Sequence, residues 1–244
     1  MSGGTIAAAS GMKAQMEALD ILANNLANMN TVGFKEQKSF YTILNDSLGS
    51  NSANDVHPLF PERTIQTNAA LNLGDGILQT TQRDLDIALM GNGFLEVSTP
   101  RGIRYTRNGS LSVNAKSQLA TVDGLPVMGK EGPILIGPGI LHITEQGDVY
   151  VNNVRAGSLK IVIPENAAIL VKEGHSLLVP SDPKMQAKPG NAVVKQGFLE
   201  QSNVNAVASV VEMVGIMRRF EAIQKTVNLL LNDVDAKSIE KLGR

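Results

Sequence analysis

Asp84 and Asp86 lie two residues apart, a spacing at which two carboxylates could share general acid and base chemistry. They alternate along the chain with Leu85, Ile87 and Leu89. Such alternation of polar and apolar residues is typical of a β-strand with one face turned to solvent. The pattern therefore favours a polar strand face over a catalytic pair. A hydrolase, the alternative, would lose its turnover on Asp84→Ala or Asp86→Ala.

Histidine is the other residue type that could act in catalysis or hold a metal, and the chain has three, His57, His142 and His175. None stands at an HxH, HExxH or HxxxH spacing, which would bring two imidazoles to one ion. The absence of cysteine removes disulfides, thiolate nucleophiles and thiolate metal ligands. The clusters GDG, GNG and GPG do not join a strand to a helix, so they indicate turns rather than a phosphate-binding loop. We therefore expect no catalytic residue, no metal and no cofactor.

Composition narrows the class of partner. The 244 residues carry a net charge of −1, which gives no electrostatic reason to expect a nucleic acid or an anionic membrane. No apolar run approaches the roughly 18–20 residues of a membrane span. Lys13, Glu17 and Asp20 interrupt the apolar stretch that a signal peptide would need. These features predict a protein that stays in the cytosol or is exported without a cleaved signal peptide, and no small-molecule substrate is indicated.

An N-terminal helix is expected over residues 1–33. Apolar residues recur there in steps of three and four, a coiled-coil-like seam, at Ala9, Met12, Met16, Leu19, Ala23 and Leu26. Asparagine costs roughly 0.5–0.7 kcal/mol in a helix interior, yet four follow closely, at Asn24, Asn25, Asn28 and Asn30. We expect their amides to form hydrogen bonds between crowded helices; the alternative is a frayed helix end rich in capping residues. Gly33 is placed to end the helix.

The rest of the chain predicts an α+β fold with a central, mainly antiparallel β domain. Residues 34–82 show no period and read as an extended, irregular linker, with a loop over Gly49–Pro58. Short apolar runs punctuated by turn residues then indicate the β domain at 83–197, in which Asn108-Gly109 and Asp123-Gly124 signal hairpin turns. A second helix follows at 198–244, so the terminal helices would form an inner domain together.

The C-terminal helix has more apolar surface than one partner helix can cover. A seam runs through Ile216, Phe220, Ile223, Val227 and Leu230, and valines surround the helix between Val204 and Val214. A helix that is apolar on every side is normally buried on every side. We therefore expect the terminal helices to pack together and against neighbouring copies. The expected assembly interface comprises Met12, Met16, Leu19, Asn24, Asn25, Leu26, Asn28, Asn30, Val210, Met213, Ile216, Phe220, Ile223, Val227 and Leu230.

Four blocks of the sequence resemble the bacterial flagellar axial proteins, the rod and hook family. They are SGMKAQMEALDILANNLANMNTVGFK (Ser10–Lys35), LDIALMGNGFLEV (Leu85–Val97), YTRNGSLSV (Tyr105–Val113) and GFLEQSNVNAVASVVEMV (Gly197–Val214), in the family's order. Within the family the chain is most similar to the proximal rod proteins, with the distal rod proteins next.

The resemblance implies a structural subunit of the periplasm-spanning flagellar rod, and not an enzyme. Such a subunit would be exported by the flagellar type III apparatus and would assemble with copies of itself and other rod proteins into a helical tube that transmits torque. A different class, a ligand-binding or adhesin module built on the β domain, predicts a specific ligand for that domain alone.

Overall fold

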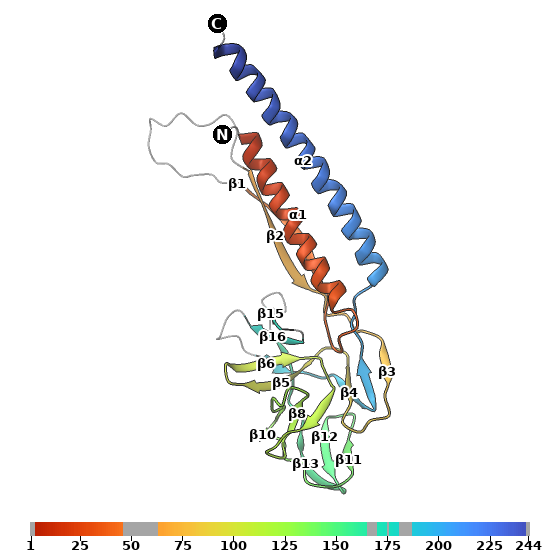
Figure 1. The fold of residues 1–244 in the computed structure, drawn as a ribbon. Coiled ribbons are helices and arrows are strands. Elements are labelled where there is room, and N and C mark those ends of the chain that lie inside the picture. Colours follow the sequence, from red (N-terminus) through yellow and green to blue (C-terminus); the bar gives the residue numbers. More distant parts are fainter. Residues whose placement is uncertain (1–2, 46–62, 165–169, 175, 181–186, 243–244) are drawn as a thin grey trace, which may run out of the picture. The chain divides into compact units, whose positions relative to one another are not determined.

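The computed structural model describes residues 3–45, 63–164, 170–174, 176–180 and 187–242, and these form two compact units (Figure 1). Of the described residues, the helical unit comprises 3–26, 37–45, 63–70 and 206–242, and the β unit comprises 27–36, 71–164, 170–174, 176–180 and 187–205. His57, His175 and the whole of the expected loop over Gly49–Pro58 lie outside the described residues.

The helical unit pairs the two ends of the chain. Helix α1 (Gly3–Ala27) and helix α2 (Ala206–Leu242) run antiparallel, and strands β1 (Gln37–Asn45) and β2 (Arg63–Leu71) form a two-stranded sheet beside α1 (Figure 1). Both strands fall in the segment from which only an extended linker was expected. With helices at both ends and antiparallel strands between them, the α+β prediction is confirmed.

The buried side of α1 consists mainly of small residues. Gly11, Ala14 and Ala18 are buried, and Leu22 continues the same line. A Cβ added at Gly11 would lie 3.9 Å from both Ile65 of β2 and Ile223 of α2. Because a strand and a second helix both approach α1, only small side chains fit between them. The seam expected from the sequence is therefore not the buried side of this helix.

Helix α2 packs against α1 through one narrow stripe of apolar side chains. Ile216 is buried against Ala18 and Leu22, and Met213 and Leu19 pack around them. Three further seam residues, Phe220, Ile223 and Val227, are half-buried, while the side chain of Leu230 lies outside the described residues. Other apolar residues of α2 remain exposed, namely Val207, Val210, Val211, Val214, Met217 and Leu229.

The β unit contains the remaining strands, and every pairing described in it is antiparallel. The largest sheet has the strand order β15-β16-β6-β5-β14-β17. The strands are β3 (Leu78–Thr80), β4 (Ile87–Met90), β5 (Phe94–Thr99), β6 (Gly102–Thr106), β7 (Leu111–Val113), β8 (Leu119–Thr121), β9 (Met128–Gly129), β10 (Gly132–Pro133), β11 (Leu141–Ile143), β12 (Asp148–Val151), β13 (Val154–Ser158), β14 (Ile161–Pro164), β15 (Leu170–Glu173), β16 (Leu177–Pro180), β17 (Ala187–Pro189), β18 (Val193–Gln196) and β19 (Phe198–Glu200).

Strand β5 is buried on both of its faces. Leu95 and Val97 belong to the main core, whereas Phe94 belongs to a second cluster with Tyr105 and Val162. Side chains alternate across a strand, so the second face also has to bury Glu96, which Lys160 neutralises at 2.9 Å. The sheet therefore separates two apolar layers.

Two expectations about local structure are wrong. Asp86 is not on a solvated face, because it is buried and paired with Arg83 at 3.2 Å. Asn108-Gly109 is not a hairpin turn, because it joins strands of different sheets, and a Cβ at Gly109 would lie 1.7 Å from the carbonyl oxygen of Ile87. Close approach of two backbones, not turn geometry, requires glycine there.

The other turn expectation is confirmed. Gly124 has a φ of +78°, and its N–H donates to the carbonyl of Thr121 at 2.9 Å. Ala120 and Pro126 form an antiparallel bridge on either side of this turn. Asp123-Gly124 therefore reverses the chain as its sequence predicts.

Candidate assembly surfaces and the buried junction

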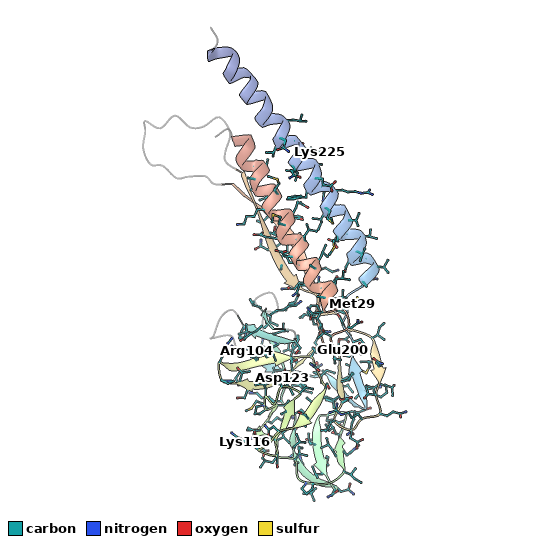
Figure 2. All side chains as sticks on the ribbon, in the orientation of Figure 1. Met29, Arg104, Lys116, Asp123, Glu200 and Lys225 are labelled. Carbon is teal, nitrogen blue, oxygen red and sulfur yellow. The ribbon has the colours of Figure 1, made fainter. Side chains whose placement is uncertain are left out.

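Four charged residues from separate segments meet inside the β unit, and we call this cluster the buried junction: Lys35, Asp75, Arg107 and Glu200. Glu200, labelled in Figure 2, is fully buried at its centre. Its Oε1 accepts hydrogen bonds from Lys35 Nζ at 2.6 Å and from the backbone N–H of Gly76 at 2.8 Å. Its Oε2 accepts one from Arg107 at 3.2 Å. One carboxylate thereby pairs with two buried cations.

Arg107 occupies the other side of the junction. Its guanidinium donates to the carbonyl oxygens of Leu89 at 3.0 Å and Gly91 at 2.5 Å, and it lies 5.2 Å from the centre of the Phe94 ring. Asp75, which is half exposed, contributes a more distant partner at 3.5 Å. Nothing in the sequence pattern identified this arginine, because its partners are separated from it by long stretches of chain.

Hydrogen bonds to the main chain connect the same segments. Asn203 accepts from the N–H of Glu36 at 2.7 Å, and its amide donates to the carbonyls of Asn72 at 2.9 Å and Gly74 at 2.8 Å. Gly33 has a φ of +69°, and a Cβ there would lie 2.4 Å from the main chain of Arg107. Along the sequence these segments adjoin α1, β2 and α2, so the junction holds the places where the chain enters and leaves the β unit.

Burial dominates the electrostatics of Lys35. Loss of hydration lowers the pKa of its amine, against the hydrogen bond and charge of Glu200, which raise it. Buried ion pairs of this kind recover little more than the cost of removing their charges from water. The junction therefore determines which segments of the chain meet. Replacing any one of its charged residues leaves another charge buried without that partner.

Lys172, outside the buried junction, is half-buried, but its amine is fully buried and has no hydrogen-bond partner among the described residues. Its Nζ lies 3.6 Å from the centre of the Phe34 ring. Burial lowers the pKa of Lys172 to about 8, while Glu36 opposes that change.

Replacing Lys172 should therefore change how stability depends on pH. Above pH 8 the folded chain releases the Lys172 proton, while the unfolded chain keeps it up to about the ordinary lysine pKa of 10.5. The free energy of unfolding of the wild-type chain therefore rises as the pH increases from 8 to 10.5. Lys172→Met removes that gain. Urea melts of the β-unit signal at pH 7 and pH 10 measure the difference. Lys116→Met, at an exposed position (Figure 2), is the control, and an equal pH effect for both variants would contradict the expectation.

The asparagine-rich end divides into two groups. Asn25 is fully buried, and its amide pairs with the main chain of Gln37, donating at 2.7 Å and accepting at 3.0 Å. Asn28 is buried as well and accepts from Thr31, beyond the end of α1. These two amides form hydrogen bonds within the chain's own fold. The side chains of Asn24 and Asn30 are exposed, and their expected contacts with neighbouring subunits stay a prediction.

A groove on the helical unit brings together residues that the sequence assigned to assembly. It measures about 500 Å³ and lies beside Met12 and Met16 of α1 and Phe220 of α2. Met16 is 56% exposed even though it is apolar. Ala9, Lys13, Glu17 and Asp20 complete the lining. We call this surface the methionine groove.

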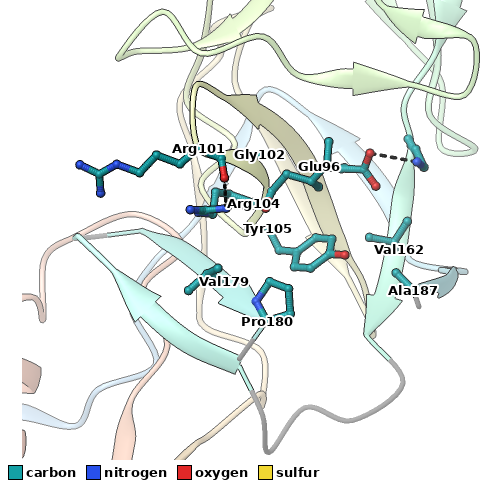
Figure 3. Close-up of a pocket in the computed structure, with 11 residues that line it drawn as sticks. Glu96, Arg101, Gly102, Arg104, Tyr105, Val162, Val179, Pro180 and Ala187 are labelled. Carbon is teal, nitrogen blue, oxygen red and sulfur yellow. Dashed lines mark hydrogen bonds and ion pairs between the residues drawn. The ribbon is translucent and has the colours of Figure 1, made fainter. Parts of the chain in front are cut away.

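The β unit also has a hollow, of about 590 Å³, against the largest sheet (Figure 3). Its charged residues are paired with each other or with near neighbours. Lys160 donates to Glu96, and Arg101 and Arg104 both donate to Glu173. Tyr105 lies among them, and burial, reinforced by Glu96, raises its pKa. A tyrosine with a raised pKa is a poor acid or base at neutral pH. Arg101, Arg104 and Lys160 already have carboxylate partners, so this hollow offers no unpaired cation to bind an anion.

The remaining candidates for chemistry do not converge. His142 is exposed on β11, an edge strand, and Asp84 is exposed while Asp86 is buried. Among the described residues no three histidine, aspartate or glutamate side chains gather as a metal site. The described helices also lack the combined length and apolarity that a membrane-crossing helix requires.

Comparison with known proteins gives matches along nearly the whole chain. Models described as "Flagella basal body rod protein", "Flagellar hook protein FlgE/F/G D1 domain" and "Flagellar basal body rod FlgEFG protein C-terminal" match residues 7–35, 88–174 and 195–229.

Curated relatives agree with the models. The flagellar basal-body rod protein FlgF of Caulobacter vibrioides is 30% identical over 230 residues, covering 93% of this chain and 92% of the relative. FlgF of Escherichia coli is 35% identical, covering 85% of this chain and 86% of the relative. The rod protein FlgG of Caulobacter vibrioides is 29% identical, covering 91% of this chain and 92% of the relative.

Proposed function

The chain belongs to the flagellar basal-body rod protein family, and from this premise we propose that it is a subunit of the proximal rod. It assembles through α1 and α2 with copies of itself and with other rod proteins into a helical tube that transmits torque. The flagellar type III apparatus exports it without cleavage of a signal peptide. The distal rod position is the alternative, since FlgG proteins are also similar over most of the chain.

The observation that carries the proposal is the apolar surface left open on the helical unit. Ile216 is buried against α1, yet Val207 is 75% exposed and Val211 is 68% exposed on the opposite side of α2. Isolated helices of this kind are marginal in water unless packing covers an apolar face. A tube of packed helices covers both sides at once, and repeated contacts that do not close into a ring build such a filament.

A deletion strain tests this role. Loss of the chain should abolish motility and leave basal bodies without a complete rod, and the wild-type chain supplied in trans should restore both. Complete basal bodies in the deletion strain would refute the proposal and favour the adhesin alternative.

The proximal and distal positions can be distinguished in the complemented strain. The chain has no cysteine, so Lys116→Cys gives one labelling site on the exposed surface of the β unit. Electron microscopy of gold-labelled basal bodies should place this site in the part of the rod nearer the cytoplasm. Label in the outer part would support the distal assignment instead.

A further inference from the structure

The helical unit has two exposed rows of apolar side chains, one on α1 and one on α2, with the same spacing along the helix. At its C-terminal end one row has an acidic residue and the other has a basic residue. On α1 the row is Ala9, Met12, Met16 and Asp20, along the methionine groove. On α2 the row is Val207, Val210, Val214 and Arg218, which we call the valine row. Both advance by steps of three, four and four residues, so both keep to one side of a helix.

Both rows are open in the folded chain. The valines at 207, 210 and 214 are 75%, 44% and 45% exposed, and Arg218 beyond them is exposed too. Met16 is 56% exposed, Met12 is half-buried, and Asp20 is exposed. The valine row lies on the side of α2 away from Ile216, so it cannot reach the methionine groove of its own chain.

We propose, resting on the rod function above, that the valine row of one copy packs parallel to α1 in the methionine groove of a second copy. In this register Val207 faces Ala9, Val210 faces Met12, Val214 faces Met16, and Arg218 faces Asp20. Equal rise per residue keeps the four pairs aligned along both helices. An antiparallel arrangement moves Arg218 toward the N-terminal end of α1, away from Asp20, so the charges select the parallel one.

The contact joins two different surfaces of the same chain. Each copy that offers its valine row keeps its own methionine groove free for a further copy. Such a contact is heterologous and propagates along a series of subunits, which is what a filament needs. Contact between two methionine grooves, by contrast, stops at a dimer.

Cysteine pairs test the register, because the wild-type chain contains no cysteine. Cells that make full-length Met16→Cys and Val214→Cys chains together should yield a disulfide-linked dimer in isolated basal bodies under mild oxidation. Cells that make either variant alone should yield none. Met16→Cys with Leu229→Cys is the matched control, since Leu229 is 70% exposed on α2 but lies beyond the aligned rows.

Every other outcome overturns the inference. Basal bodies that contain both variants without a cross-link would show that the rows do not meet, while the rod function would stand. Self-linked Met16→Cys or Val214→Cys would show a contact between like surfaces, and a linked chain of another mass would identify a different rod protein as the occupant. Absence of the chain from basal bodies would instead refute the proposed function.

Charge reversal gives an independent measurement. Arg218→Asp and Asp20→Arg should each lower the yield of the Met16–Val214 cross-link by about tenfold, because like charges then face each other. The double variant should restore most of the yield, and Lys116→Asp, on the β unit, should leave it unchanged. Equal losses in the single and double variants would show that the two residues do not meet.

Discussion

Glu200→Ala should lower the free energy of unfolding of the β unit by about 3–5 kcal/mol, the usual effect of removing one member of a buried ion pair. The substitution leaves Lys35 and Arg107 buried without the carboxylate that pairs with both, and it removes the acceptor of the Gly76 N–H. Urea unfolding of the full chain, followed by a β-unit signal at pH 7, measures the loss.

A surface pair provides the control. Asp148 accepts a hydrogen bond from Arg155 at 3.0 Å, which holds the pKa of the Asp148 carboxyl below its usual range, but Arg155 is exposed and Asp148 is only half-buried. Asp148→Ala should therefore cost less than about 1 kcal/mol. Lys35→Met added to Glu200→Ala should recover part of the loss, because one unpaired cation is then gone. A loss for Glu200→Ala as small as for Asp148→Ala would contradict the central role of Glu200.

Phe220→Asp should abolish motility and rod assembly while leaving the β unit intact. Phe220 is half-buried on α2 and lines the methionine groove, so the variant places a carboxylate among Met12, Met16 and Ala9. A buried carboxylate without a partner is costly enough to prevent packing or to force its own protonation. Motility in soft agar and the chain content of isolated basal bodies measure the effect.

Two further variants isolate the cause. Phe220→Leu keeps an apolar side chain and should retain assembly, whereas Lys225→Asp, at an exposed position (Figure 2), tests charge alone and should be milder than Phe220→Asp. The β-unit melt should change by less than about 0.5 kcal/mol in all three. Normal assembly with Phe220→Asp would refute the packing role, and a collapsed β-unit melt would mean that α2 shares a core with that unit.

The sequence predicts the kinds of elements better than it predicts which of their faces are buried. Helical periodicity correctly indicates α1 and α2, and Ile216 is buried as its seam requires. On α1, however, the buried line runs through Gly11, Ala14 and Ala18, because β2 approaches from one side and α2 from the other. A periodicity search detects large apolar residues. It misses a buried helix face made of glycine and alanine, whose small side chains allow close packing.

The buried junction lay beyond sequence reasoning for a different reason. Lys35, Arg107 and Glu200 each resemble an ordinary surface charge in their local context. Only the tertiary fold brings them together, and no local pattern records that. Asn25 is similar: its position in the helix was conspicuous, but its partner, the main chain of Gln37, belongs to a strand that the pattern did not reveal.

The pairing of Lys35 with Glu200 has a consequence for the order in which the chain folds. The two residues are 165 positions apart, and a chain that emerges from its N-terminus presents Lys35 long before Glu200. Until Glu200 arrives, the β unit cannot enclose Lys35 and Arg107 together, and closing so long a loop is slow. Complete folding of the β unit therefore waits until most of the chain is available, which is compatible with the export route proposed above for this chain.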